Sequence, residues 1–199
     1  MAGLVVVATQ DIREEILHSF ATSLAPAVPV RLNSSRAHFR SVTAPSWVKI
    51  LETPEFWITT FIASVAWDGL KSTIINRRAI VTHVRRAALT TLSGFLEALS
   101  ELGAQLGQGT DLLLGCPVPD DWFSTVMQLR SSPPDAMEED MAMFLLHLPG
   151  IEKFLSSHVD TLMGQVTLTP CEDGTMLVAW MDRATLSPQQ ASLTLEDVA

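Results

Sequence analysis

The chain has 199 residues, of which 47% are apolar and 18% are charged, and its formal net charge is −9. This composition excludes a disordered chain, which would be less apolar and more charged, and eleven prolines and ten glycines are too few for a fibrous protein. The length is enough for one well-buried domain.

The charge is distributed unevenly along the chain. Residues 1–86 contain ten basic and six acidic side chains, whereas residues 87–199 contain three basic and sixteen acidic ones. Such a split indicates that the two halves attract each other or face different partners. It argues against nucleic-acid binding by the whole chain, which would need a broadly basic face.

The cysteines and the N-terminus predict a cytoplasmic protein, and we expect a bacterial host. Cys116 and Cys171 are far apart in the sequence, and a small secreted domain would carry more cysteines. The N-terminus has no basic segment before its short apolar run, so this run is interpreted as a first strand rather than a signal peptide.

Residues 1–51 predict a strand–helix–strand unit followed by a loop and a short helical piece. The apolar run at 4–8 is typical of a buried strand, and Asp11 can cap a helix that ends before Pro26. The expected elements are a strand at 4–8, a helix at 11–24, a strand at 28–32, a loop at 33–45 and a helical piece at 46–51.

Residues 56–106 predict a long apolar pair of antiparallel helices. Residues 56–75 are apolar or small on almost every face, which is typical of a central core helix or of a membrane span. Asp68 and Lys71 favour the core helix, because each would cost about 2.5–3.5 kcal/mol near the middle of a bilayer. Residues 79–106 carry a clean apolar stripe, and a bend at 76–78 would complete the hairpin.

The last part of the chain predicts one strand, three helices and a β-hairpin. Ser131-Ser132-Pro133-Pro134 is the clearest break, and the turn at Glu172-Asp173-Gly174 is typical of a hairpin. The expected elements are a strand at 111–116, helices at 120–129, 135–147 and 149–160, strands at 166–169 and 176–181, and a polar tail with a weak helical or extended stretch near 193–195.

Together these elements predict an α+β, or loosely α/β, fold. We expect a single mixed sheet of about five strands packed with several helices, in one domain spanning 1–199. A second interpretation places an internal boundary at 131–135, but neither side of it holds a complete set of elements.

An aromatic group is the first candidate functional feature. Trp57 and Phe61 lie four residues apart on one expected helix face, and Trp67 flanks the same surface. Core packing explains them simply, whereas tryptophan is enriched at the energetic centres of protein interfaces. The three residues are therefore interface candidates, and residues 56–75 remain a candidate membrane contact.

A basic cluster is the second candidate feature. It could bind a phosphate, a nucleotide or an acidic protein surface, or it could be a solvated bend that pairs with the acidic half of the chain. The candidate anion-binding residues are Lys71, Arg77, Arg78, Arg85 and Arg86.

A third candidate site lies at the predicted carboxyl ends of strands, where α/β proteins commonly bind ligands. It would include Thr9, Asp11, Cys116 and Asp120. Burial explains Cys116 and helix capping explains Asp120 without a further assumption. The sequence contains no motif with metal-ligand or nucleophile spacing, so no catalytic residue, metal or cofactor is predicted.

The segment from Ala63 to Lys71 resembles a sequence found in small accessory modules of bacterial conflict and signalling systems. That resemblance covers about a tenth of the chain and implies no site residue. The function that we expect is a non-enzymatic protein–protein interaction or regulatory module, with a protein partner or a second copy of the chain as its ligand. The alternatives are a small enzyme or ligand-binding domain with a site near Cys116 and Asp120, and a membrane-associated protein.

Overall fold

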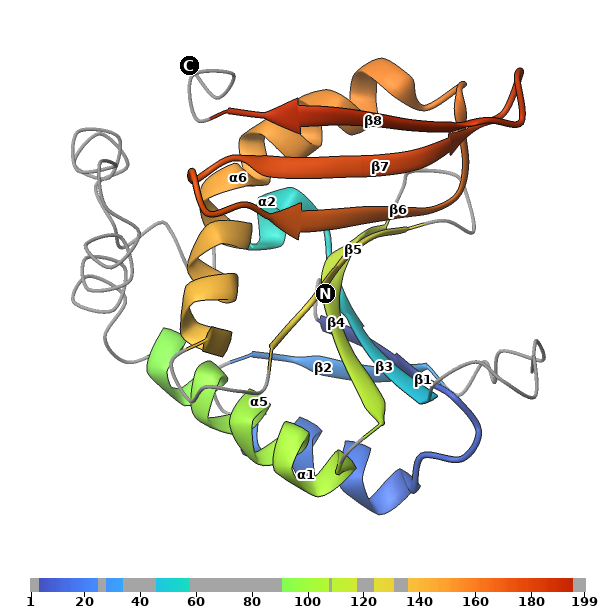
Figure 1. Cartoon of the computed structure of the whole chain (residues 1–199). Helices are drawn as coiled ribbons and strands as arrows, with labels where there is room; N and C mark the ends of the chain where they lie inside the picture. The colour runs from blue at the N-terminus through green and yellow to red at the C-terminus, as the bar shows by residue number, and fades with distance from the viewer. Residues whose placement is uncertain are drawn as a thin grey trace.

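The computed structural model describes residues 4–24, 28–33, 46–57, 91–107, 109–117, 124–130 and 136–194. Its strands form one mixed sheet in the order β2-β1-β3-β4-β5-β6-β7-β8 (Figure 1). The elements are β1 (Leu4–Ala8), α1 (Glu14–Leu24), β2 (Val30–Asn33), β3 (Ser46–Leu51), α2 (Pro54–Trp57), α5 (Thr91–Leu106), β4 (Thr110–Pro117), β5 (Ser124–Gln128), α6 (Ala136–His158), β6 (Leu162–Pro170), β7 (Met176–Asp182) and β8 (Pro188–Leu193).

The prediction of a mixed α and β fold with one mixed sheet is confirmed, but the sheet has eight strands rather than about five. Each of the five expected strands is present, with ends shifted by a few residues. The three additional strands are β3, β5 and β8. Only Phe56 and Trp57 of the first arm of the expected helical hairpin are described, in α2, and α5 is the described part of its second arm.

Two of the additional strands replace expected helices. β3 alternates between half-buried and buried positions, with Val48 and Ile50 turned to the core, which is the period of a strand. β5 carries the β-branched residues Thr125 and Val126, which fit a pleated surface well. Pairing with neighbouring strands outweighs the local helix-start signals before both segments.

α6 is one helix, although Pro149 predicted a break there. Proline removes one helical hydrogen bond and its ring crowds the carbonyl four residues earlier, so it bends a helix. Figure 1 shows α6 changing direction along its length. Leu145, Leu148 and Ile151 are buried on both sides of the proline, and this packing keeps the helix continuous.

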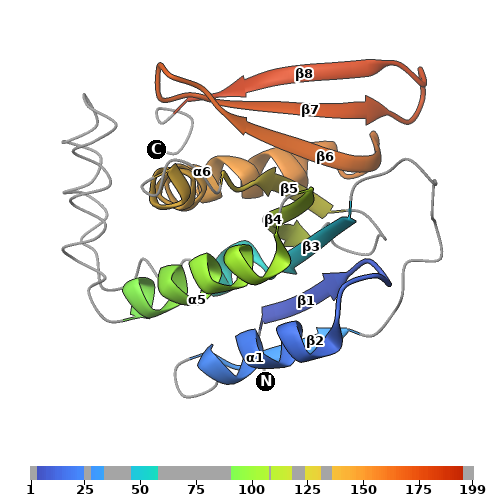
Figure 2. The ribbon, with the colours of Figure 1, turned by 60° about the horizontal axis from the view of Figure 1, so that its bottom comes forward.

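One face of the sheet carries the hydrophobic core. Val6, Ile50, Leu114 and Val178 point to this face from four strands, and all of them belong to one core cluster. Figure 2 shows α1, α5 and α6 along the same side of the sheet. This packing buries the apolar stripes of the helices and leaves the other face of the sheet with no helix from the described residues over it.

Candidate functional site

Trp57 lies in the core and is not exposed on a surface. Its side chain is 0% exposed, and its indole N–H donates to the Gly115 carbonyl at 3.2 Å. Its ring packs edge-on against Phe144 and Phe95, with centroid distances of 5.6 and 5.9 Å. The structure therefore makes Trp57 a core residue and not the interface residue that its spacing suggested.

Several of the other candidates lie outside the described residues. They are Phe61 and Trp67 of the aromatic group, the whole basic cluster (Lys71, Arg77, Arg78, Arg85 and Arg86), Asp120, and the expected boundary at 131–135. Most of the candidate membrane segment at 56–75 lies outside them too. In the described part of the chain, no helix combines the length and apolarity that crossing a membrane requires.

The structure does not bring the strand-end residues together. β1 runs antiparallel to β3, and β3 runs parallel to β4, so the carboxyl ends of β1 and β4 lie at opposite ends of the sheet. Thr9 and Asp11 follow β1, whereas Cys116 is buried near the end of β4. The expected burial of Cys116 is confirmed, and a single site containing all of these residues is not formed.

A pocket of about 580 Å³ does lie beside the end of β1. Its polar lining includes Arg13 and His18 as well as the acidic Glu14 and Glu15, and apolar side chains from β1, α1 and β2 complete it. Thr9 is held in place because its hydroxyl accepts from the Trp47 amide at 3.2 Å. The volume is within the range of small-molecule sites.

A surface that the sequence did not suggest lies at the other end of the molecule. In the described part of the chain, the exposed large apolar side chains are Val159, Met163, Met181 and Leu186. Met163 and Met181 face each other across β6 and β7, and the Arg183 amide donates to the Thr161 carbonyl at 2.7 Å. These contacts bring Met163 and Met181 side by side, and Val159 and Leu186 lie in the connections before β6 and after β7 at the same end of the sheet. We call these four residues the apolar end.

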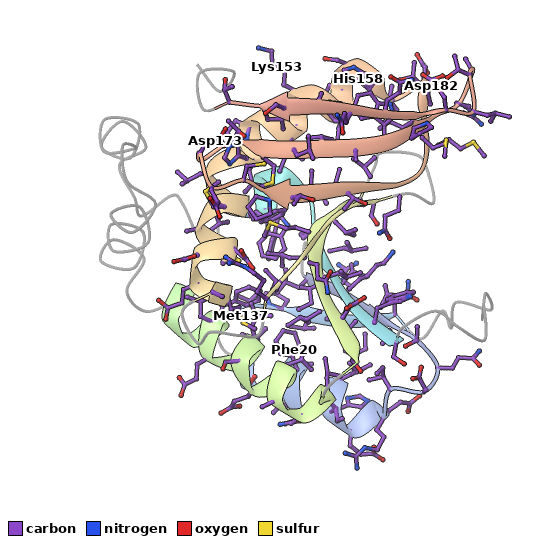
Figure 3. All side chains as sticks on the ribbon, viewed as in Figure 1. Phe20, Met137, Lys153, His158, Asp173 and Asp182 are labelled. Atoms are coloured by element: carbon purple, nitrogen blue, oxygen red, sulfur yellow. The ribbon has the colours of Figure 1, made fainter. Side chains whose placement is uncertain are left out.

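The turn between β7 and β8 holds Leu186 in an unusual conformation. Leu186 has a φ of 52° and is 67% exposed. The Asp182 carboxylate accepts from the Ala184 and Thr185 amides at 3.0 and 2.8 Å, and these bonds lower the pKa of Asp182. The turn is therefore held by its own hydrogen bonds. Figure 3 shows Asp182 at this end of β7 and Asp173 at the other.

Lys49 lies on the face of the sheet that no described helix covers, which we call the open face. The Lys49 ammonium donates to the Gln165 Oε1 at 2.6 Å and lies 4.6 Å from the centre of the Trp47 ring. Burial lowers the pKa of Lys49 below its ordinary value of 10.5. Gln165 meets Lys49 on this face, and Met163 precedes it on β6 across the register shift at Gly164, so the cation and the apolar end share this strand.

Two other buried polar groups belong to the core. Asp140 accepts from the backbone amide and guanidinium of Arg130 at 2.7–3.0 Å, which joins the end of β5 to α6. His147 Nδ1 lies 2.9 Å from the Met143 carbonyl oxygen. Its Nε2 is buried and has no hydrogen-bond partner among the described residues. Burial lowers the pKa of His147, and the nearby Met143 and Gly174 backbone partly opposes that shift.

The described residues contain no group of three histidine, cysteine or acidic side chains placed to hold a metal ion. Comparison of the chain with protein-family models, with curated proteins and with solved structures finds no match. The candidate function therefore depends on the surface chemistry of this chain alone.

Proposed function

We propose that this chain is a protein-interaction module that binds an extended, apolar segment of a partner protein at the apolar end. One observation carries the proposal: the large apolar side chains exposed in the described part of the chain lie at one end of the sheet, with Met163 and Met181 paired across β6 and β7 and Val159 and Leu186 in the adjoining connections. Scattered apolar residues on a surface need no explanation, whereas a contiguous group is typical of an interaction site.

The conformation of Leu186 supports the proposal. A non-glycine residue at a positive φ costs about 1–2 kcal/mol, and asparagine or glycine would avoid most of that cost. Leucine adds the further cost of apolar surface exposed to water. A residue that is unfavourable in both respects is expected where a partner uses its side chain.

The apolar end also has the properties of a good binding surface. The hydrogen bonds of Asp182 fix the turn before any partner arrives, so little conformational entropy is lost on binding. Methionine side chains are flexible and polarisable, and they adapt to different apolar partners. Met163 and Met181 are directly opposite each other, as two adjacent contacts for an extended segment.

Methyl NMR tests this proposal with internal controls. The protein is labelled with 13C at the methionine methyl groups and titrated with a capped neutral hexapeptide, LSLSQS, whose two leucines point to the same side when it is extended. We expect the Met163 and Met181 methyl signals to shift with a Kd of about 1 mM or below. Signals from the buried Met127, Met141 and Met176 should stay in place.

Unchanged Met163 and Met181 signals at saturating peptide would contradict the proposal. Equal shifts at the buried methionines would contradict it too, because they would indicate a change in the whole fold. Light scattering of the protein without peptide gives its molecular mass and tests whether a second copy of the chain occupies the surface. A stable dimer that Leu186→Asn dissociates would mean that the surface binds this chain itself.

The pocket beside β1 favours a second candidate function, the binding of a small polar molecule. Leu32→Trp should fill the pocket from β2 without changing its charged groups. If the candidate is correct, small carboxylate and amine fragments will shift the backbone signals of Ala8 and His18 in the natural protein and not in this variant. If no fragment shifts these signals in the natural protein, or if each fragment causes equal shifts in both proteins, this candidate is ruled out.

A further inference from the structure

Lys49 is a cation on the open sheet face that no acidic side chain of the described residues contacts. In the described part of the chain, its ammonium contacts Gln165 and the Trp47 ring, and neither is a carboxylate. The chain as a whole has 22 acidic residues against 13 basic ones, so counter-ions are abundant in the sequence. The absence of one here is therefore a local property of the surface.

Lys49 lies among buried apolar side chains of the open sheet face. β4 and β5 separate β3 from β6, and yet Lys49 and Gln165 meet across them. Leu113 and Val126 lie on this face of β4 and β5, and both are buried although neither belongs to the core cluster. They form an apolar floor beneath the Lys49 side chain.

The partial burial of Lys49 makes an incoming carboxylate favourable. A cation that has lost part of its hydration gains more from an ionic hydrogen bond than a fully solvated one does. Asp111, on the same face of β4, accepts from the Gln128 amide at 2.7 Å. Gln165 Oε1 is occupied by Lys49, which leaves the Gln165 amide N–H groups as further donors beside the ammonium.

We propose that Lys49, Gln165 and Trp47 form a carboxylate-binding site for an acidic side chain of the partner segment. The inference rests on the proposed function, because it names the chemistry of the partner that the apolar end would hold. Met163 and Gln165 both lie on β6, on the two sides of Gly164, where the pairing with β7 shifts register. A segment that places a leucine on Met163 is therefore expected to reach Lys49 with a glutamate that follows it closely in sequence.

Two peptides that differ in one side chain test this inference. The protein is titrated with the neutral hexapeptide LSLSQS and with its acidic counterpart LSLSES, and binding is followed by the Met163 methyl and the Trp47 indole N–H signals. We expect LSLSES to bind at least fivefold more tightly. The Trp47 signal should shift strongly with the acidic peptide alone.

The Lys49→Met variant should bind the two peptides equally, because it keeps the length of the side chain and removes the charge. Lys153→Met is the matched control: it removes the same charge from an exposed position on α6 and should keep the preference. Circular dichroism checks that each variant is folded. If Lys49→Met does not fold, Lys49→Gln takes its place.

Each outcome decides one of the two proposals. Equal binding of the two peptides to the natural protein would overturn the carboxylate site and leave the apolar end standing. A preference that survives Lys49→Met, or that Lys153→Met also removes, would overturn it as well, since attraction would then be non-specific. If neither peptide binds, the proposed function fails, and the carboxylate site fails with it.

Discussion

Lys49 on β3 and Gln165 on β6 meet at 2.6 Å, although β4 and β5 lie between their strands. In a flat sheet, strands three places apart are separated by about 14 Å. The long side chains of Lys49 and Gln165 span much of that separation, and Gly115 on β4 lets β4 and β5 approach closely. A Cβ added to Gly115 would overlap the Thr125 carbonyl oxygen of β5.

The first prediction concerns Gly115. Gly115→Ala should destabilise the protein by about 4 kcal/mol or more, because the clash is with backbone and cannot be relieved by a side-chain movement. Gly103→Ala is the control, since its Cβ would meet the Met137 methyl at an ordinary 3.8 Å. Alanine is favoured in helices, so this control should gain about 0.5–1 kcal/mol. Urea unfolding measures both, and a stable Gly115→Ala protein would refute the role of close strand approach.

The second prediction concerns pH. The pKa of Lys49 is lowered in the folded protein from an unfolded value near 10.5. The folded state therefore binds fewer protons between these two values, and stability should rise as the pH increases through that window. Lys49→Met should flatten the rise. The chain has no tyrosine, so few other groups titrate there. If the unfolding free energies of the natural protein and of Lys49→Met change with the same slope between pH 8 and 10, burial of the ammonium is contradicted.

The third prediction tests the position of Trp57. Trp57→Ala should cost about 3–5 kcal/mol of unfolding free energy, as other large-to-small aromatic changes in cores do. Trp57→Phe should cost less, because it keeps ring contacts with Phe95 and Phe144 and loses the hydrogen bond to Gly115. Equilibrium unfolding measures the change. Normal stability combined with a changed molecular mass would restore the interface interpretation.

The fourth prediction concerns the ion pair between Arg130 and α6. Asp140→Asn should cost about 1–3 kcal/mol, because the buried carboxylate accepts from both the backbone and the guanidinium of Arg130. Glu139→Gln is the matched control: Glu139 lies 3.3 Å from the same guanidinium and is more exposed, so its loss should cost less than about 1 kcal/mol. If chemical denaturation shows that both variants lose the same unfolding free energy, the larger contribution of the buried Asp140 is contradicted.

Some of the strands could be predicted from the sequence, and three of them could not. β1 and β7 were found because their β-branched and apolar runs are bounded by clear turns. β8 has polar residues on both sides, as an edge strand with exposed faces can, and so gives little signal. β3 and β5 are short, and the helix-start residues before them outweighed their alternation in the prediction.

The candidate site was harder to predict than the fold. Met163 and Met181 each occupy an outward position in a recognisable strand, and only tertiary structure shows that they face each other. Lys49 and Gln165 are 116 positions apart, and no local pattern connects them. The conformation of Leu186 depends on the hydrogen bonds of its turn, which a leucine in the sequence does not indicate.

The fifth prediction tests the central claim, that Leu186 is kept for binding at the expense of stability. Asparagine accepts a positive φ more readily than leucine does, so Leu186→Asn should not lower the unfolding free energy and should raise it by up to about 1 kcal/mol. The same variant should bind the hexapeptide LSLSQS about tenfold more weakly, the loss of one binding hot spot. Measuring both quantities on this one variant is the most direct test. Unchanged peptide affinity would contradict the account.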